Sequence, residues 1–355
     1  MPVDYFTQRD DDNKFKIREI RKNLPAFLGE FFRGVSQNTT PLTQLGYARD
    51  LKLFFDFLVA ETAEFYGKNP CELEISDLDK LTSTHLEMFL EYIELYKVDG
   101  KVFKNQERAK ARKLSSIRAM LKYFYKKDQI KNNIAAKIDT PKIHDKEIIR
   151  LEMDEVERVL DIAETGEDMT NMQKGFHEHT KARDYAMLSL FLGTGIRISE
   201  CVGLDIDDFD FKQNAFKITR KGGNKVILYF NEDVSDALQN YILERRLIKA
   251  QPGHEKALFL SMQNKRISVR AVQLLVKKYS RIVNPLKKIT PHKLRSTFGT
   301  NLYRATNDIY IVADVLGHKD VNTTRKHYAA ISDDIRRNAA TKIKFRDDKK
   351  DDENK

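Results

Sequence analysis

The sequence predicts a mainly α-helical protein of two domains, with a small antiparallel β-sheet in the second domain. Its 355 residues suffice for two domains, and 41% of them are apolar, which is enough for two hydrophobic cores. Apolar residues recur at helical spacing along most of the chain. One charged stretch, residues 138–149, lacks this spacing and contains Pro141, so we expect it to be a linker between the domains.

Helical periodicity dominates residues 1–137, the expected first domain. Thr40 is suited to cap a helix that begins at Pro41, and further helices are predicted over residues 83–96 and 106–127. The last of these has an apolar side and a basic side. The apolar side holds Leu114, Ile117, Leu121 and Phe124, and the opposite side holds Arg108, Arg112, Ser115, Ala119, Lys122 and Lys126.

The charge of the chain is unevenly distributed. The 63 basic and 53 acidic residues give a net charge of +10. Residues 61–100 hold ten acidic and three basic side chains, whereas residues 101–143 hold thirteen basic and three acidic ones. Such segregation favours one face for the phosphates of DNA or RNA. The basic side of the 106–127 helix would rest on a phosphate backbone, and an ordinary solvated face is the alternative.

The expected second domain covers residues 150–331. Two short strands, 214–219 and 225–230, flank a basic turn and predict a β-hairpin. Residues 332–355 divide into a short helix over 332–343 and a charged tail that we expect to be disordered. Further helices are predicted over residues 153–164, 181–192, 234–247, 268–279, 292–304, 308–316 and 322–328.

Several classes of protein disagree with the composition. No apolar run approaches the ~20 residues of a membrane helix, and residues 1–16 are too polar for a secretion signal. The two cysteines, Cys71 and Cys201, lie far apart and indicate neither a disulfide framework nor a zinc site. We therefore expect a cytoplasmic protein without membrane contact, metal or cofactor.

Arg197 is the first of several side chains in the second domain that are suited to bind phosphate. It follows the sequence Gly193-Thr194-Gly195 at the end of an apolar segment, where a charge needs a partner. Glu200 lies one helical turn further and could orient the guanidinium. The alternative is that the two residues form only a structural ion pair.

Three further segments add cationic and phenolic groups. His292 and Arg295 are three residues apart and share one face of a helix, where an arginine can bind two phosphate oxygens. Lys221 lies in the hairpin turn, His318 follows Leu316-Gly317, and Tyr328 comes ten residues later. Taken singly, these residues have ordinary interpretations: a surface salt bridge, a solvated turn, a helix start and a core tyrosine.

Together and in this order, the segments resemble the tyrosine recombinases, also called phage integrases. Cys201 stands where the family usually has leucine, and Arg220 where it usually has glycine. Ten residues separate His318 from Tyr328, where many members have nine. The matching motifs are Thr194-Gly195-Ile196-Arg197-Ile198-Ser199-Glu200, Arg220-Lys221-Gly222-Gly223-Asn224-Lys225, the box from His292-Lys293-Leu294-Arg295 to Thr300, and Leu316-Gly317-His318 with Thr323-Thr324 and Tyr328.

The resemblance extends to the first domain, where residues 47–58 and 114–124 are similar to the family's DNA-binding helices. It implies a C-shaped clamp of two domains around double-stranded DNA, which is cut and rejoined through a 3′-phosphotyrosyl intermediate without metal or ATP. The implied catalytic residues are Arg197, Lys221, His292, Arg295, His318 and the nucleophile Tyr328, with Glu200 in support. The implied DNA contacts are Arg108, Arg112, Ser115, Ser116, Arg118 and Lys122.

Among the subgroups of this family, the chain is most similar to the cellular Xer recombinases, in particular the XerH kind that acts as a single recombinase. This implies resolution of chromosome dimers at a dif site during chromosome partition and cell division. The implied partners are three further copies in a tetramer, joined by exchange of C-terminal helices, and the DNA translocase FtsK. The alternatives are a mobile-element integrase, a relaxing topoisomerase of the same chemistry, and a non-catalytic DNA-binding protein with a helix-turn-helix over residues 309–328.

Overall fold

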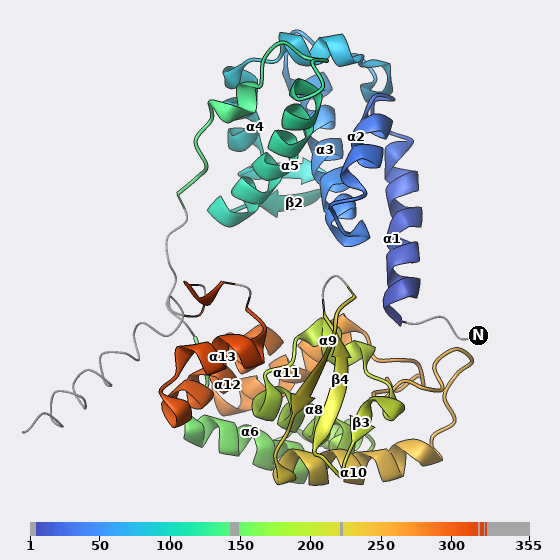
Figure 1. The fold of residues 1–355 in the computed structure, drawn as a ribbon, viewed down its shortest axis with the longest axis vertical. Coiled ribbons are helices and arrows are strands. Elements are labelled where there is room, and N and C mark those ends of the chain that lie inside the picture. Colours follow the sequence, from blue (N-terminus) through green and yellow to red (C-terminus); the bar gives the residue numbers. More distant parts are fainter. Residues whose placement is uncertain are drawn as a thin grey trace, which may run out of the picture. The chain divides into compact units, whose positions relative to one another are not determined.

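The computed structural model describes residues 5–98, 100–142, 149–220, 223–318, 320–322 and 324. The chain divides into two compact units, Met1–Lys146 and Glu147–Lys355, and each is described by itself. Helices predominate in the described ranges and the sheets are small and antiparallel, so the predicted mainly helical class is confirmed (Figure 1). None of the helices in these ranges has the length and apolar character needed to cross a membrane.

The first unit packs its helices around a core rich in phenylalanine. Thr40 caps α3 as predicted, because its hydroxyl accepts a hydrogen bond of 3.3 Å from the backbone N–H of Thr43. The predicted apolar side of α5 is buried and packs against α3. The helices are α1 (Tyr5–Arg21), α2 (Leu28–Val35), α3 (Pro41–Glu61), α4 (Ser83–Tyr92) and α5 (Glu107–Tyr125), with 3-10 turns at Pro70–Glu72, Ile75–Lys80 and Ile134–Ala136.

A β-hairpin between α4 and α5 corrects the helix predicted over residues 83–96. The helix ends at Tyr92, and β1 (Leu95–Val98) then pairs antiparallel with β2 (Lys101–Lys104). Gly100, which follows Asp99 in the sequence, has a φ of +75°, as two-residue hairpin turns require. Tyr96 stacks on Phe103 across the two strands, with ring centroids 5.3 Å apart. The tight turn at Gly100 and the strand pairing therefore end the helix before residue 96, although the apolar spacing alone favours a longer helix.

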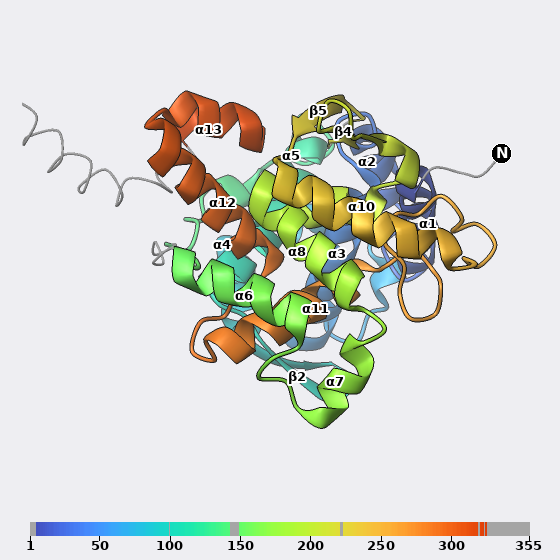
Figure 2. The ribbon, with the colours of Figure 1, turned by 90° about the horizontal axis from the view of Figure 1, so that it is seen from below.

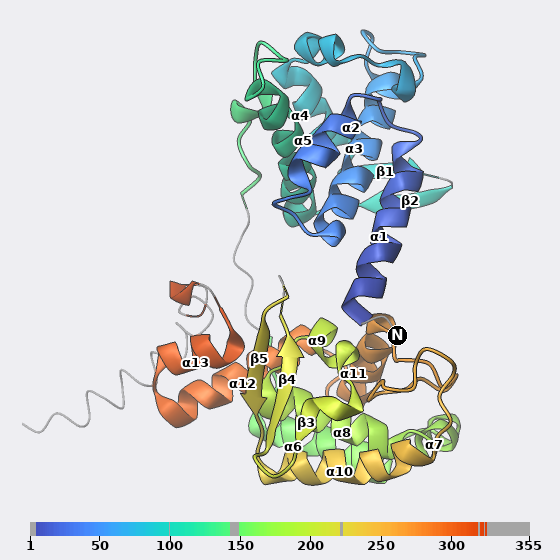
Figure 3. The same cartoon turned by 45° about the vertical axis from the view of Figure 1, so that its right-hand side comes forward.

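The second unit is built around α8. Helices α6, α10 and α12 pack against it (Figures 2 and 3). The predicted hairpin is present as β4 and β5, and β3 extends it to a three-stranded antiparallel sheet. The elements are α6 (Met153–Thr165), α7 (Asn171–His177), α8 (Lys181–Thr194), α9 (Ile198–Gly203), a 3-10 turn at Ile206–Asp208, β3 (Phe209–Asp210), β4 (Ala215–Thr219), β5 (Lys225–Tyr229), α10 (Glu232–Leu247), α11 (Val269–Val283), α12 (Pro291–Thr306) and α13 (Ile309–Leu316).

Candidate active site

Helix α8 ends in a turn that only glycine fits. Gly195 has a φ of +61°, and its N–H donates to the carbonyl of Phe191 over 3.1 Å. A Cβ atom on Gly195 would lie 2.4 Å from Cδ1 of Phe298, which is closer than real side chains approach. The left-handed turn redirects the chain, so that Arg197 becomes the N-cap residue of α9.

Arg197 is held in one orientation by a buried carboxylate. Its backbone N–H donates to Oε2 of Glu200 and its Nη1 donates to Oε1, both over 2.9 Å. The Glu200 side chain is 4% exposed, whereas that of Arg197 is 36% exposed. A buried carboxylate that accepts two hydrogen bonds fixes the guanidinium while one side of the arginine stays accessible.

Arg295 reaches the same place from helix α12. Its side chain is buried, with 6% of the residue exposed. Nη1 donates to the carbonyl of Gly195 over 2.5 Å, and Nη2 donates to the carbonyl of Leu316, to which Nη2 of Arg197 also donates over 3.2 Å. The two arginines therefore converge on one carbonyl group. His292 lies one turn earlier on α12 and is exposed.

Two of the three carbonyl groups that hold these arginines, those of Leu316 and Gly317, form the C-terminal end of α13. Gly317 ends the helix with a φ of +61°, and its carbonyl accepts from Nη2 of Arg197 over 3.1 Å. The last carbonyls of a helix lack partners within the helix and carry its negative dipole end. They therefore suit cationic groups. His318 follows directly, and its Nδ1 lies 2.7 Å from Oγ1 of Thr324.

Two predicted catalytic residues, Lys221 and Tyr328, lie outside the described residues, as do residues 332–355. The ends of the turn that carries Lys221 are described. The Arg220 N–H donates to the carbonyl of Asn224 over 2.8 Å, and the Gly223 N–H donates to the carbonyl of Arg220 over 3.0 Å. The two ends of the predicted turn are therefore hydrogen-bonded to each other, as are the strands that precede and follow it.

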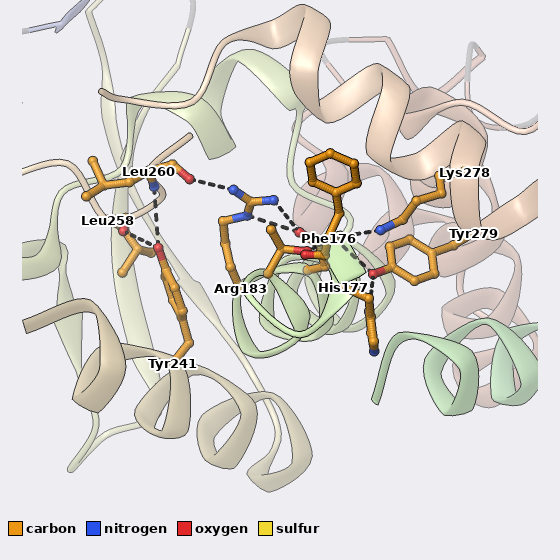
Figure 4. A network of polar contacts seen from close by, with 10 residues as sticks. Phe176, His177, Arg183, Tyr241, Leu258, Leu260, Lys278 and Tyr279 are labelled. Carbon is orange, nitrogen blue, oxygen red and sulfur yellow. Dashed lines mark hydrogen bonds and ion pairs between the residues drawn. The ribbon is translucent and has the colours of Figure 1, made fainter. Parts of the chain in front are cut away.

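A buried polar network anchors the other end of α8 (Figure 4). Asp184, in the first turn of α8, accepts hydrogen bonds from Arg183, Lys278 and the hydroxyl of Tyr279, at 2.7, 3.1 and 2.9 Å. Burial and the Asp184 carboxylate raise the pKa of Tyr279, so its hydroxyl remains protonated and continues to donate. His177 contacts the same hydroxyl over 3.2 Å. The network fixes the first turn of α8 to α11. The candidate site lies at the opposite end of α8, where the helix leads into Gly195.

Four of the six side chains predicted to contact DNA are exposed along one side of α5. They are Arg108, Arg112, Ser115 and Lys122. Arg112 is oriented by Asp50 of α3, which accepts two hydrogen bonds from its guanidinium, at 2.5 and 2.7 Å. The Asp50 residue is 2% exposed, whereas 56% of the Arg112 side chain is exposed. A fixed and accessible guanidinium suits a phosphate contact.

The two other predicted contacts are engaged within the unit. Ser116 is buried, and its hydroxyl donates to Oδ2 of Asp50 over 2.7 Å. Arg118 donates to the carbonyls of Ala135 and Ile138 and to the hydroxyl of Thr140. Ser116 therefore supports the carboxylate that orients Arg112, and Arg118 ties the end of the first unit to α5.

Sequence reasoning missed two residues of these sites. Asp50 has basic neighbours in sequence, Arg49 and Lys52, but its guanidinium partner is Arg112, 62 residues away, so the local sequence does not indicate this pair. The sequence indicates for Arg220 only that it stands where the family usually has glycine. Its Nη2 donates to the carbonyl of Val315 over 3.1 Å. The signal that could have drawn attention to Arg220 is a second cation directly before Lys221.

Comparisons with known proteins show to which family the chain belongs. The family model described as "Phage integrase family" matches residues 149–334. Tyrosine recombinase XerC of Caldanaerobacter subterraneus subsp. tengcongensis is 34% identical over 326 residues, which cover 90% of this chain and 86% of that protein. These matches confirm the predicted tyrosine recombinase family and the predicted class of enzyme, which breaks and rejoins DNA.

Two solved structures have similar folds. The XerH site-specific recombinase bound to difH substrate has a TM-score of 0.59 at 20% identity, covering 86% of this chain and 81% of that one. The Tn1549 transposon integrase in complex with a circular intermediate DNA has a TM-score of 0.61 at 18% identity, covering 87% of this chain and 97% of that one. At these identities the likeness shows the fold alone.

Proposed function

The chain belongs to the phage integrase family and is a site-specific tyrosine recombinase of the Xer type, and we propose that it resolves chromosome dimers at a dif-type site. The observation that supports a phosphate-cutting centre is the convergence of Arg197 and Arg295 on the Leu316 carbonyl, although 98 residues separate the two arginines in sequence. An ordinary surface salt bridge pairs one arginine with one carboxylate, so it does not explain why two arginines donate to the same carbonyl group.

The two arginines clamp the scissile phosphate in this proposal. A guanidinium has five N–H donors, so Arg197 can hold Glu200 and two carbonyls and still donate to a phosphate oxygen. His318, which follows the α13 carbonyls, donates to the same nonbridging oxygens. Positive charge and hydrogen-bond donors that are already in place stabilise the charge of the transition state.

The reaction is a transesterification at phosphorus. The phenolic oxygen of Tyr328 attacks the phosphorus atom, the bond to the 5′-oxygen breaks, and the strand end becomes a 3′-phosphotyrosine. Lys221 gives a proton to the leaving 5′-oxygen. The phenolic proton of Tyr328 passes to His292 where this residue acts as base, or to solvent where His292 acts as a donor at the phosphate. The 5′-hydroxyl of another strand reverses the step, so the bond energy is conserved without ATP or metal.

The assembly proposed around this chemistry uses the whole chain. The first unit binds duplex DNA through the exposed side of α5, in the expected C-shaped clamp. Four subunits recombine two sites, joined by exchange of the helix expected over residues 332–343. The reaction takes place in the cytoplasm, with the DNA translocase FtsK as partner, and one recombinase of the XerH kind suffices for both strands.

A nicked suicide substrate tests the chemistry. Incubation of the full chain with a radiolabelled, nicked dif-type duplex should give a covalent protein–DNA adduct that survives denaturation. Tyr328→Phe should abolish the adduct while retaining DNA binding. Tyr310→Phe is the matched control, because Tyr310 is an exposed tyrosine on α13. An adduct of normal yield in Tyr328→Phe would disprove the assigned nucleophile.

The chromosomal role needs a separate test. DNA recovered with the trapped protein from cells should map to one chromosomal site near the replication terminus, and loss of the protein should leave unresolved chromosome dimers. Recovery of the ends of a mobile element instead would show an integrase. Relaxation of plasmids without paired sites would show a topoisomerase.

A further inference from the structure

Arg220 joins the end of β4 to the end of α13. Its Nη2 donates to the carbonyl of Val315 over 3.1 Å. A Cβ atom on Gly317 would lie 2.0 Å from Nη1 and 2.3 Å from Cζ of Arg220. The guanidinium therefore lies directly beside Gly317, the residue before His318, and occupies the space that any larger side chain would need.

The backbone of Arg220 also fixes the hairpin tip. Its N–H donates to Asn224 and its carbonyl accepts from Gly223, so it is bonded to both residues that end the turn on the β5 side. Only residues 221 and 222 lie between these bonds. One residue thus ties the tip of the hairpin, through its side chain, to the turn that carries His318.

Three arginines hold three consecutive carbonyls at this helix end. Arg220 binds Val315, Arg295 binds Leu316, and Arg197 binds both Leu316 and Gly317. Burial, and the positive charge of Arg197, lower the pKa of Arg220, while the carboxylate of Glu200 opposes this shift. A cation placed beside another cation needs compensation, which the helix-end carbonyls and Glu200 supply.

We propose that Arg220 is a positioning residue, which ties the described ends of the hairpin turn, Arg220, Gly223 and Asn224, to the C-terminal end of α13, so that the proton donor proposed between these ends and His318 can act on the same phosphate. Arg220 does not itself contact the reacting atoms in this role. The inference rests on the proposed function of Lys221 as the donor to the leaving oxygen. It predicts that loss of Arg220 impairs protonation of the leaving group more than it impairs phosphate binding.

A substrate with sulfur in place of the bridging 5′-oxygen tests this role. A thiolate leaves without a general acid, because its conjugate acid is far more acidic than an alcohol. Arg220→Met should cleave the ordinary suicide substrate at least tenfold more slowly than the unchanged enzyme in single-turnover reactions. The sulfur substrate should restore its rate to within about threefold. Arg220→Lys, which keeps the charge, should show the same pattern with a smaller loss.

Arg266→Met is the matched control. Like Arg220, Arg266 is an arginine that donates to backbone carbonyls, here those of Val202 and Leu204; it also pairs with Asp205, and it lies outside the proposed site. Any loss of rate in this variant should be equal on the two substrates. Thermal melting and DNA binding of each variant establish that it is folded.

The outcomes separate the inference from the function on which it rests. Rates of Arg220→Met that fall equally on both substrates, or that do not fall at all, overturn the positioning role. Lys221→Ala should lose activity on the ordinary substrate and recover on the sulfur substrate. If Lys221→Ala does not recover on the sulfur substrate, the proposed function of Lys221 as proton donor fails. Recovery of Arg220→Met in that case would show that Arg220 acts on protonation of the leaving group, but not through the 220–224 turn.

Discussion

Replacement of Gly195 by alanine should destabilise the second unit and disturb the site together. The new Cβ atom would lie 2.4 Å from Cδ1 of Phe298 and 3.0 Å from a methyl carbon of Leu316. Phe298 packs against the buried Val312 and Leu316, so it cannot move away freely. The carbonyl of Gly195 also accepts from Arg295, so a shift of this turn moves an acceptor that fixes a proposed catalytic group.

The magnitude follows from two separable effects. A residue with a side chain in the left-handed conformation costs about 1–2 kcal/mol, and forcing extra volume into a packed region costs about 1–3 kcal/mol. Gly195→Ala should therefore lower the free energy of unfolding by about 2–5 kcal/mol. Gly253 has a φ of +84° and nothing within 4 Å of its Cβ position. Gly253→Ala should show the backbone effect alone, about 1–2 kcal/mol.

Calorimetry of the full chain is the assay, because it resolves the transitions of two units where a single two-state fit would not. The loss in Gly195→Ala should appear in one transition only, and single-turnover cleavage should slow in the same variant. A loss no larger than that of Gly253→Ala would refute the reasoning, since the contact with Phe298 would then contribute nothing.

Three further predictions concern other buried groups. Asp50→Asn removes the charge that binds Arg112 and should lower the free energy of unfolding of the first unit by about 1–3 kcal/mol in urea titrations. An equal loss in Asp56→Asn, whose carboxylate pairs with Lys52 at the surface, would contradict this. Glu200→Gln should slow single-turnover cleavage about tenfold with little change in DNA affinity. The guanidinium of Arg197 loses its charged partner in this variant but keeps the carbonyls of Leu316 and Gly317. Weaker DNA binding at an unchanged cleavage rate would contradict this prediction. Burial lowers the pKa of His177 below its usual 6.5, so the unfolded chain takes up a proton that the folded chain does not, and thermal stability should fall as the pH drops from 7.5 to 5.5; His177→Gln should flatten this dependence, and an unchanged dependence would exclude His177 as its source.

Local chemistry predicted much of the fold. Three features could be predicted from short stretches of sequence: the cap at Thr40, the helical spacing of the apolar side of α5, and the alternation in the strands on both sides of residues 220–224. Helix α1 was not predicted individually, because its sequence is mostly polar and it buries only Asn13 and Ile17. The hairpin of β1 and β2 was missed because its residues also fit the apolar spacing of the preceding helix.

The candidate site was predictable as a set of residues but not as a geometry. The order of Arg197, His292, Arg295 and His318 along the chain identified the family. That order contains no information on which carbonyl each guanidinium binds, because those pairs form only when α8, α12 and α13 pack together. Arg220 shows the limit most clearly, since its partner Val315 is 95 residues away.

Backbone carbonyls, rather than acidic side chains, accept most of the hydrogen bonds described for the guanidinium groups of Arg197, Arg220 and Arg295, at the end of α13 and at Gly195. A salt bridge at each arginine would cancel its charge and would have to be broken before an incoming strand could be gripped. Carbonyl dipoles restrain the side chains but do not neutralise their charge, so the electric field around the arginines still attracts anions. The C-terminal carbonyls of α13 therefore orient the arginines before the substrate binds.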